Sequence, residues 1–436
     1  MGLRHFVPLA GLLTPLLAGP VLAAGYQLNE QDATQVGLSL AGNAIEHAPA
    51  VQASNPAGLA NLPGTQLQVG SNLYSVGSLL SNAGSTTLLG TPARGTAGDL
   101  TLTTPTPFFY LSHAFTDRIS AGLGVSTLFG LGTHYPDGWF GRYFALDTDL
   151  KTVDVNPNLS YRLLDTLSVG AGFYVRYSRA KVTKALDLGG ISAANGIPAV
   201  PEGQDGIVRL DADEWGAGYK LGLDWHPTPA LEVGASFRSG QHSRLDGTAH
   251  FTLSPAGQIL SSLTGSLVQS SITAASSDPA TAAVAIGYAV TPDLKLLGEV
   301  DWVNWKTFKE LRVVFANPAQ PDSAVTGHWR DTWKIAAGLT YKLLPQIELR
   351  GGTAWEESPI PDPAHRTPLL PDSNRVWLSA GVGWSVTPAT QVNLGYAHLF
   401  FSDTTLVSSD PASGILRVTT SQGHAEIVSL DVITRF

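Results

Sequence analysis

The chain has 436 residues, a length that could hold about two or three soluble globular domains. Charged residues make up only 14% of it, against about 25% in a typical soluble protein. The absence of cysteine excludes disulfides, cysteine-ligated zinc and a lipid anchor on cysteine. A formal net charge of −9 without any cluster of Lys and Arg argues against a nucleic-acid partner.

The first residues predict export from the cytoplasm. The basic pair Arg4-His5 precedes an apolar stretch over residues 6–22, and the small residue Ala23 follows as a cleavage site. The alternative, a membrane anchor, needs about 20 unbroken apolar residues, whereas three prolines interrupt this stretch. We therefore expect residues 1–23 to be a secretory signal peptide.

The next segment, residues 24–63, shows no strand-like alternation. Apolar residues such as Val36 and Leu40 suggest short helical turns, which Gly37 and Gly42 interrupt. If the rest of the chain forms a wide barrel, the barrel would be an open water pore unless something fills it. We expect this segment to be a hatch that plugs the lumen; the alternative is a periplasmic tail.

From residue 64 onward the chain alternates in steps of two. Between residues 167 and 178 the odd positions are apolar or aromatic, including Val169 and Phe173, and the even positions are mostly small or polar. Period-two alternation predicts β-strands with one apolar and one polar face. The same pattern recurs at residues 231–238, 333–342, 378–384 and 428–432.

The connections distinguish a membrane barrel from a soluble sandwich. Five of them are very short, at residues 163–166, 226–229, 290–293, 343–346 and 386–390. Five others are long and polar, at residues 189–206, 254–280, 317–327, 358–374 and 403–414. Short turns at one end and long loops at the other are typical of outer-membrane barrels. We expect residues 64–436 to form an all-β, transmembrane antiparallel barrel of about 14 strands in the outer membrane of a Gram-negative bacterium.

Aromatic residues fit that placement. Phe436 ends the chain on the apolar parity of Val428, Leu430 and Val432, where a terminal aromatic acts as the signal for the barrel assembly machinery. We expect six tryptophans to form a girdle at the lipid interface, with stacking on a ligand as the alternative. They are Trp225, Trp302, Trp305, Trp333, Trp377 and Trp384.

Several short motifs resemble the FadL family of outer-membrane transporters. They are GYQLNEQ at residues 25–31, AGNA at 41–44, Asn55-Pro56-Ala57, NPNLSYR at 156–162, YSRAK at 177–181, DWVNW at 301–305 and SPIP at 358–361. In this order they cover essentially the whole mature chain. The resemblance implies a 14-stranded barrel with an N-terminal hatch, and uptake of long-chain fatty acids or, in some members, aromatic hydrocarbons.

The resemblance also implies site residues. Tyr26 corresponds to an aromatic residue that lines the binding pocket, Lys184 to a basic residue that contacts the acid head group, and Glu356 to an acidic residue beside the Ser-Pro motif. Both charged positions have lumen-facing parity; the alternative is two solvated charges at loop bases. A second basic residue of the family is replaced near Val325 and Thr326. Since a carboxylate in an apolar pocket needs a charged partner, fatty acids and neutral hydrocarbons both remain open as substrates.

Gate residues follow from the same resemblance. The family's hatch carries the motif that Asn55, Pro56 and Ala57 match here. The family's third strand kinks inward and opens a side gate in the barrel wall. Gly130 and Gly132 make such a kink feasible, because glycine tolerates bulges and bends.

The long connection at residues 254–280 has no charge before Asp278. Its apolar residues stand at helical spacing and predict an apolar helix face. The resemblance implies a surface groove that first captures substrate, and the alternative is a helix packed on the barrel rim. The candidate capture residues are Ile259, Leu260, Leu263 and Leu267.

The sequence as a whole favours passive uptake of a hydrophobic molecule. The expected steps are capture at surface loops, binding in the lumen, movement of the hatch and exit through the wall beside residues 55–57. Catalytic motifs such as Gly-x-Ser-x-Gly and His-Glu-x-x-His are missing, and the histidines we considered show no metal-ligand spacing. We therefore expect no enzyme activity, cofactor or metal. A general porin and a surface receptor or adhesin are the alternatives.

Overall fold

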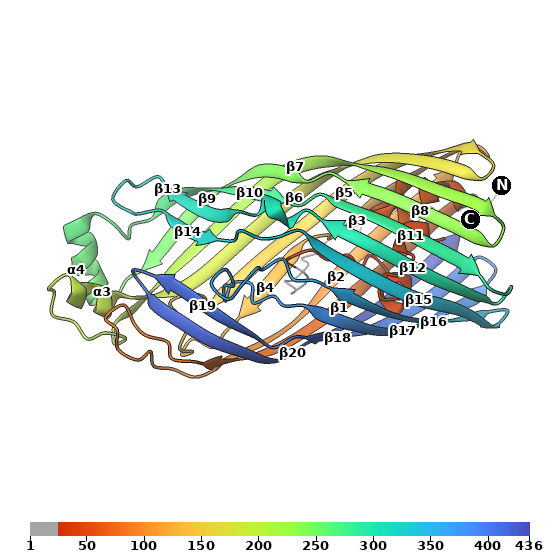
Figure 1. Cartoon of the computed structure of the whole chain (residues 1–436). Helices are drawn as coiled ribbons and strands as arrows, with labels where there is room; N and C mark the ends of the chain where they lie inside the picture. Colours follow the sequence, from red (N-terminus) through yellow and green to blue (C-terminus); the bar gives the residue numbers. More distant parts are fainter. Residues whose placement is uncertain (1–24) are drawn as a thin grey trace, which may run out of the picture.

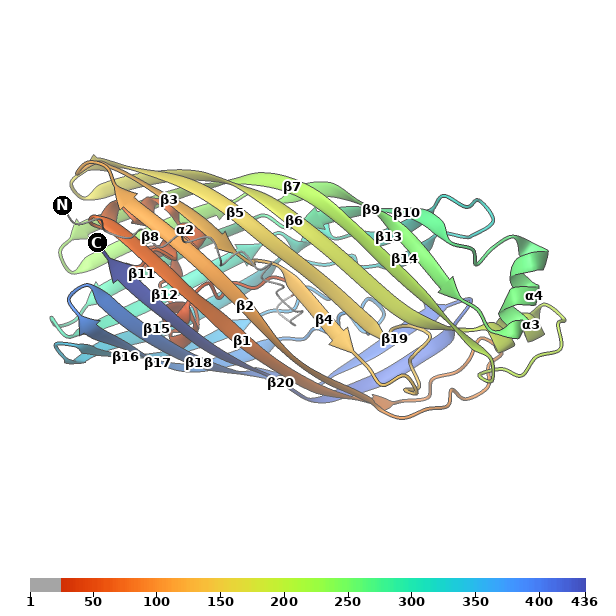
Figure 2. The same cartoon turned by 180° about the vertical axis from the view of Figure 1, so that it is seen from behind.

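The alternation of apolar and polar residues builds one continuous antiparallel sheet in the computed structural model, which describes residues 25–436. The predicted signal peptide, residues 1–23, lies outside the described residues. The sheet curls into a long barrel, seen from two sides in Figures 1 and 2. Within residues 25–436, none of the helices has the length and apolar character needed to cross a membrane.

Fourteen strands of the described part form the closed ring. In order they are β1 (Thr65–Asn82), β2 (Gly98–Ala114), β3 (Ile119–Ser126), β5 (Asp147–Leu164), β6 (Leu167–Asp187), β7 (Asp205–Thr228), β8 (Leu231–Arg238), β11 (Thr281–Ala289), β12 (Leu294–Val303), β15 (Thr332–Leu344), β16 (Ile347–Glu356), β17 (Arg375–Thr387), β18 (Thr390–Phe401) and β20 (Gly414–Arg435). The last strand pairs with the first, Val432 opposite Val69, so the sheet closes on itself. Closure pairs backbone groups that lipid cannot hydrogen-bond, and the predicted barrel is confirmed.

Further strands lengthen the wall beyond the ring. They are β4 (Gly130–His134), β9 (Gln241–Thr252), β10 (Ser270–Asp278), β13 (Glu310–Phe315), β14 (Ser323–Thr326) and β19 (Thr404–Asp410). Two helices, α3 (Leu188–Ala194) and α4 (Pro255–Thr264), lie at this end of the barrel, and the short turn η3 (Trp305–Thr307) follows β12. The C-terminus lies at the opposite end, together with the short turns. Short turns are periplasmic in such barrels, so α3 and α4 are extracellular.

Strand β6 shows how the sequence sets the two faces of the wall. Its odd positions point outward, and Val169 and Phe173 are exposed to what is lipid in the membrane. Its even positions, including Tyr174 and Arg176, are buried inside. Phe436 continues the outward parity of β20 and is 77% exposed. An outward apolar band and a polar interior are the arrangement a bilayer requires.

The segment formed by residues 25–63 (the N-terminal segment) packs against the inward face of the wall. It contains α1 (Ala33–Gly37), η1 (Asn43–Ile45), α2 (Val51–Ser54) and η2 (Pro56–Asn61). The approach is so close that a Cβ on Gly222 would lie 1.9 Å from Oδ1 of Asn55, and one on Gly352 would lie 2.1 Å from the Leu38 carbonyl oxygen. Glycines on the inward face therefore make room for this segment.

The expected tryptophan girdle holds for only part of the set. Trp225, Trp333 and Trp384 are exposed on the outer face, as predicted. Trp305 and Trp377 are buried inside the protein, so the prediction was wrong for these two. Trp305 follows the end of β12 in η3, and there it turns inward to pack against the N-terminal segment.

Candidate ligand-binding site

An apolar cavity of about 140 Å³ lies inside the barrel beside Tyr26 (the inner cavity). Its lining is dominated by aliphatic and aromatic side chains, with Leu131, Phe308, Trp329 and Leu370 among them. Such a lining suits a hydrophobic ligand, which gains free energy by leaving water. Tyr26, predicted to line a pocket, is 8% exposed and lies in this lining.

Tyr26 belongs to an aromatic cluster. Its ring centre is 4.9 Å from that of Trp305, 5.6 Å from that of Phe129 and 6.2 Å from that of Trp329. The Tyr26 hydroxyl donates a hydrogen bond of 3.2 Å to the carbonyl oxygen of Ser277. Tilted and edge-on ring pairs of this kind hold a side chain in place, so one end of the inner cavity is preformed.

A bulge in the wall brings Tyr26 to this position. Between β3 and β4, residues 127–129 stand opposite only two residues of β5, 152–153. The extra residue turns this stretch inward, where the N–H of Leu28 donates to the Leu128 carbonyl (2.8 Å) and the N–H of Gly130 donates to the Tyr26 carbonyl (2.9 Å). The N-terminal segment thus pairs with the bulge.

The same bulge interrupts the ladder between neighbouring strands. β2 pairs with β3 from Ala114 to Phe109, whereas β4 forms its ladder with β5 alone among the described strands. Gly130 and Gly132 lie directly after the bulge on β4, and neither has a positive φ. A Cβ on Gly130 would lie 3.1 Å from Cδ1 of Leu28, so Gly130 serves close packing rather than a left-handed turn. Next to residues 55–57 the ladder is continuous, with Gly170 opposite Gly222. The interruption therefore lies beside Tyr26 and the predicted gate residues Gly130 and Gly132, and not beside residues 55–57.

Asn55 fixes the middle of the N-terminal segment. Its Oδ1 accepts from the N–H of Ala57 (3.0 Å) and so caps η2, which begins at Pro56. Its Nδ2 donates to the carbonyl oxygens of Ala44 (2.7 Å) and Leu223 (2.9 Å), the latter on β7. Asn55 thus fastens the segment to the wall.

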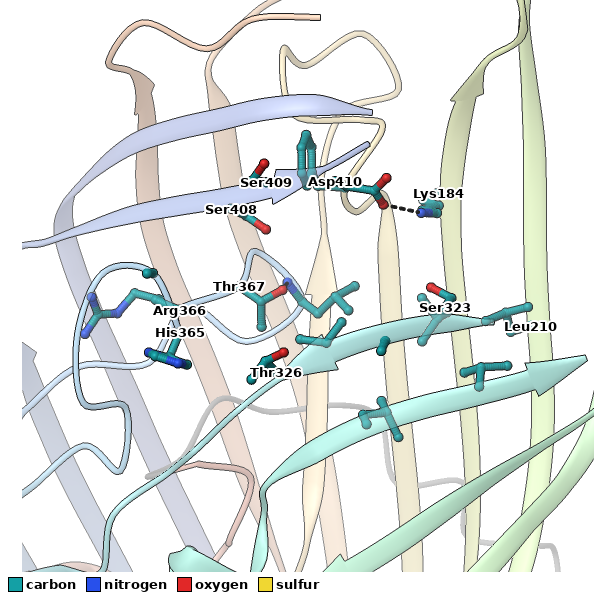
Figure 3. A pocket seen from close by; sticks show the side chains of 18 of the residues that line it. Lys184, Leu210, Ser323, Thr326, His365, Arg366, Thr367, Ser408, Ser409 and Asp410 are labelled. Atoms are coloured by element: carbon teal, nitrogen blue, oxygen red, sulfur yellow. Dashed lines mark hydrogen bonds and ion pairs between the residues drawn. The ribbon is translucent and has the colours of Figure 1, made fainter. Parts of the chain in front are cut away.

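A second cavity of about 210 Å³ lies on the extracellular side of the first (the outer cavity; Figure 3). Lys184 lines it and lies 3.6 Å from Asp410 of β19. His365 and Arg366, from the loop after β16, complete a more polar lining. Lys184 thus faces the lumen side, as its parity predicts, but it lines the outer and not the inner cavity.

The outer and inner cavities share part of their walls. The shared residues are Val182, Leu311, Val325, Thr326, His365, Thr367 and Leu369. These shared side chains are therefore the wall between the outer and the inner cavity. The two positions at which the sequence indicated a missing cation, Val325 and Thr326, lie in this shared wall.

Glu356 lies apart from both cavity linings. It is buried at the end of β16, where its Oε2 accepts from Nε1 of Trp377 (3.0 Å) and lies 3.8 Å from Nε of Arg375. Lys334 stands opposite it on β15. The structure thus brings Tyr26 and Lys184 to adjacent cavities that share a wall, and it places Glu356 in a separate charged cluster.

A buried ionic network under the inner cavity was not predicted. Arg176 pairs with Asp154 and Asp278, and its guanidinium lies 4.3 Å from the ring centre of Phe129. Arg238 lies 3.2 Å from Asp154. These arginines come from lumen-facing positions of β6 and β8, but the acids that neutralise them are distant in the sequence, so the pattern of one strand does not reveal the network.

The extracellular helix α4 matches the predicted capture helix in part. Ile259 and Leu263 are exposed, at 51% and 72%, whereas Leu260 is buried. The helix ends at Thr264 because Gly265 adopts the left-handed conformation (φ 69°). Leu267 therefore lies beyond the helix, which corrects the expectation that all four residues share one helical face.

Comparisons with known proteins agree with this architecture. The model of the family described as outer membrane protein transport protein (OMPP1/FadL/TodX) matches residues 14–436. The long-chain fatty acid transport protein of Escherichia coli K12 is 25% identical over 88% of this chain and 89% of its own. Outer membrane protein P1 of Haemophilus influenzae is 25% identical over 96% of both chains.

Solved structures share the fold. The crystal structure of a Pseudomonas aeruginosa FadL homologue superposes with a TM-score of 0.87 at 23% identity, over 95% of this chain and all of the other. The Pseudomonas putida toluene transporter TodX gives 0.72 at 16% identity, over 95% and 99% of the two chains. The chain therefore belongs to the OMPP1/FadL/TodX family of outer-membrane transport proteins.

Proposed function

We propose that this chain takes up long-chain fatty acids through the adjacent outer and inner cavities, with the carboxylate at Lys184 and the alkyl chain toward Tyr26. The observation that carries the proposal is the wall shared by a polar outer cavity and an apolar inner one. An amphipathic acid fits this order of environments, and burying its alkyl chain supplies about 25 cal/mol per Å². This gain needs no energy source, and the proposed role is transport rather than catalysis.

The proposed path begins at α4, whose exposed Ile259 and Leu263 offer an apolar surface to a molecule arriving from outside. It continues through the outer and inner cavities. The N-terminal segment then acts as a hatch, because its pairing with the bulge beside Tyr26 blocks the way onward. The interrupted ladder between β2 and β4 is the proposed exit into the membrane.

A neutral hydrocarbon is the second candidate. Of the described residues that line the inner cavity, one is a lysine, Lys181, and its Nζ lies 3.9 Å from Oδ2 of Asp211. Lys184 in the outer cavity is already paired with Asp410. A carboxylate would have to compete with these acids for a cation, whereas an aromatic hydrocarbon needs none.

Binding of a labelled long-chain fatty acid to the purified protein in detergent tests the proposal, with unlabelled fatty acid, an alkane and toluene as competitors. We expect saturable binding that Lys184→Ala weakens about 1.4- to fivefold, since a partly exposed ion pair contributes about 0.2–1 kcal/mol. Lys306→Ala is the matched control, because Lys306 forms an exposed pair with Asp331 (3.0 Å) outside both cavities.

Two outcomes would contradict the fatty-acid proposal. Displacement by toluene and alkane, with equal affinity in wild type and Lys184→Ala, favours the hydrocarbon candidate. Absence of saturable binding favours a general porin or a surface receptor.

Two partners belong to the same proposal. Outer-membrane lipids contact the outward apolar positions, such as Phe173 and Leu221, both of which are exposed. The terminal Phe436 serves the barrel assembly machinery as its recognition signal, and its exposed side chain is available for that contact.

A further inference from the structure

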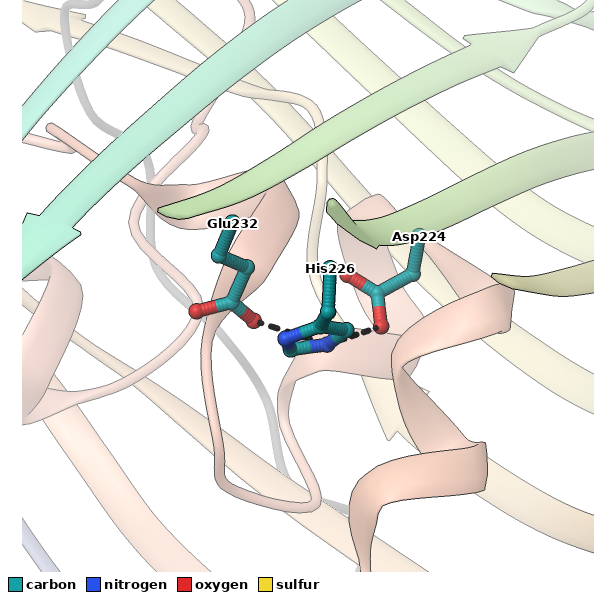
Figure 4. Close-up of side chains that lie close together, drawn as sticks. All are labelled: Asp224, His226 and Glu232. Carbon is teal, nitrogen blue, oxygen red and sulfur yellow. Dashed lines mark hydrogen bonds and ion pairs between the residues drawn. The ribbon is translucent and has the colours of Figure 1, made fainter. Parts of the chain in front are cut away.

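A cluster of one histidine and two acids lies at the periplasmic end of the barrel, outside the linings of the two cavities (Figure 4). Asp224 and His226 stand near the end of β7, and Glu232 stands near the start of β8 across a short turn. One potential ligand atom from each of the three lies within 4.8 Å of the others. The short turn brings these side chains together on the inward face of the wall.

A fourth side chain comes from the N-terminal segment. His47 places its Nε2 2.8 Å from Oε1 of Glu232. Nε2 of His226 lies 3.6 Å from that same oxygen and 3.0 Å from Oδ2 of Asp224. Two imidazole nitrogens and two carboxylates therefore converge from two consecutive strands and from the N-terminal segment, which is distant from them in the chain.

The spacing of these atoms suits a tetrahedral zinc ion. Zn²⁺ binds nitrogen and oxygen at about 2.0–2.2 Å in tetrahedral geometry, so its ligand atoms are about 3.3–3.6 Å apart. The three separations in the cluster, 2.8, 3.0 and 3.6 Å, lie around that value. Small side-chain rotations would bring the four ligands to equal distances from one ion.

An unsatisfied oxygen points to a cation. The Asp224 side chain is 1% exposed, and its Oδ1 is buried without a hydrogen-bond partner. A buried carboxylate oxygen without a partner is costly, and a metal ion is a ligand that would satisfy it. The neighbouring donors bind other oxygens: Nδ2 of Asn61 reaches Oδ2 of Asp224 (2.6 Å), and Nζ of Lys295 reaches Oε2 of Glu232 (2.6 Å). Because Oδ2 is the oxygen that lies 3.0 Å from His226, rotation of the Asp224 carboxyl group would bring its free Oδ1 to the ion.

Charge and access also agree with a divalent ion. The two carboxylates exceed the one lysine beside them by one negative charge when the imidazoles are neutral, which is the form that binds metal. His47 is 51% exposed, so a hydrated ion can reach the cluster from solvent. Lys295 competes for Glu232 but leaves Oε1 to the histidines.

We infer that His47, Asp224, His226 and Glu232 form a zinc site that ties the N-terminal segment to the barrel wall. Histidine spacing along the sequence gave no sign of it, because His47 and Glu232 are 185 positions apart. A coordinated ion replaces hydrogen bonds that break and re-form easily, so zinc strengthens the attachment of the segment at its periplasmic side. The inference does not depend on which hydrophobic molecule is transported.

Zinc binding to the full-length mature protein tests the site. After treatment with EDTA, titration with ZnCl₂ is expected to show one ion per chain, with His226→Ala binding at least about tenfold more weakly. His134→Ala is the matched control, because it removes another histidine paired with an acid, Asp147, at the extracellular end. Failure of the wild type to bind, or equal affinity in wild type and His226→Ala, would overturn the site.

Amide hydrogen exchange tests whether zinc links the N-terminal segment to the barrel wall. We expect zinc to slow amide exchange in residues 40–60 of the wild type and to have no such effect in His47→Ala, whose zinc affinity also falls at least about tenfold. Because His47 is half exposed, this variant should fold. Unchanged affinity in His47→Ala, or equal protection by zinc in both proteins, would show that the ion does not join segment and wall. Since the measurement uses zinc alone, a failure of fatty-acid binding leaves it unaffected.

Discussion

The outer and inner cavities share a wall but differ in chemistry. The outer one carries Lys184 and Asp410, partly exposed groups that water or a polar head can solvate. The inner one is bounded by the ring cluster around Tyr26, with its nearby arginines already bound to acids. The charged side chains of this lumen therefore fall into two groups. Those in the outer cavity are accessible to a ligand, and those below the inner cavity stabilise the barrel.

Removing a charge below the inner cavity is the strongest test of this difference between the two cavities. Arg176→Ala leaves Asp154 and Asp278 buried without their shared partner, which is expected to lower the free energy of unfolding by about 3–5 kcal/mol. Arg179→Ala, on the same strand, breaks only an exposed pair with Asp211 and should cost less than about 1 kcal/mol. Unfolding in urea, followed by tryptophan fluorescence, measures both.

The opposite result would show that Arg176 binds the ligand rather than stabilises the barrel. If Arg176→Ala unfolds like the wild type but loses affinity for fatty acid, its charge is not structural. The inner cavity would then contain the cation that a carboxylate needs, and the division of tasks between the two cavities would fail.

The next largest effect is expected at the boundary of the inner cavity. Tyr26→Ala removes a ring that packs against Phe129, Trp305 and Trp329, and each such pair is worth about 0.5–1.5 kcal/mol. Binding of the labelled fatty acid should weaken about 10- to 100-fold. Tyr26→Phe keeps the ring and loses only the hydrogen bond to Ser277, so its affinity should stay within tenfold of the wild type.

Equal losses in the two variants would mean that the hydroxyl, and not the ring, is what the ligand contacts. Equal affinity in Tyr26→Ala and wild type would place the ligand elsewhere in the lumen. Either result would show that the ring of Tyr26 does not form the apolar end of the ligand-binding site.

The barrel itself could be predicted from the sequence because its determinants are local. Period-two alternation sets which face of each strand meets lipid, and loop length sets which end is periplasmic, so neither requires knowledge of distant contacts. Trp305 shows the limit: on sequence it joins the girdle, but the turn after β12 directs it inward against Tyr26.

The site was less accessible to sequence reasoning because distant segments build it. Parity placed Lys184 and Glu356 on the inward face, but it does not say how far along the barrel each lies, and they occupy separate clusters. Asp410, the partner of Lys184, comes from a strand added outside the ring. The resemblance to the FadL family supplied Tyr26, whose surroundings became visible only with the bulge at residues 127–129.

The smallest expected effect concerns the wall between the cavities. Thr326 lines both of them and is exposed, so Thr326→Lys would place a cation where the sequence lacks one. We expect fatty-acid affinity to rise about fivefold, for a gain of about 1 kcal/mol, with no change for toluene. Ala324→Lys is the control, because Ala324 lies on the same strand and lines only the outer cavity.

A gain confined to Thr326→Lys would show that the carboxylate passes the shared wall, whereas equal gains would mean that it stays in the outer cavity. A loss in Thr326→Lys would indicate that this wall must remain uncharged for the alkyl chain to pass, which favours a neutral hydrocarbon as the substrate.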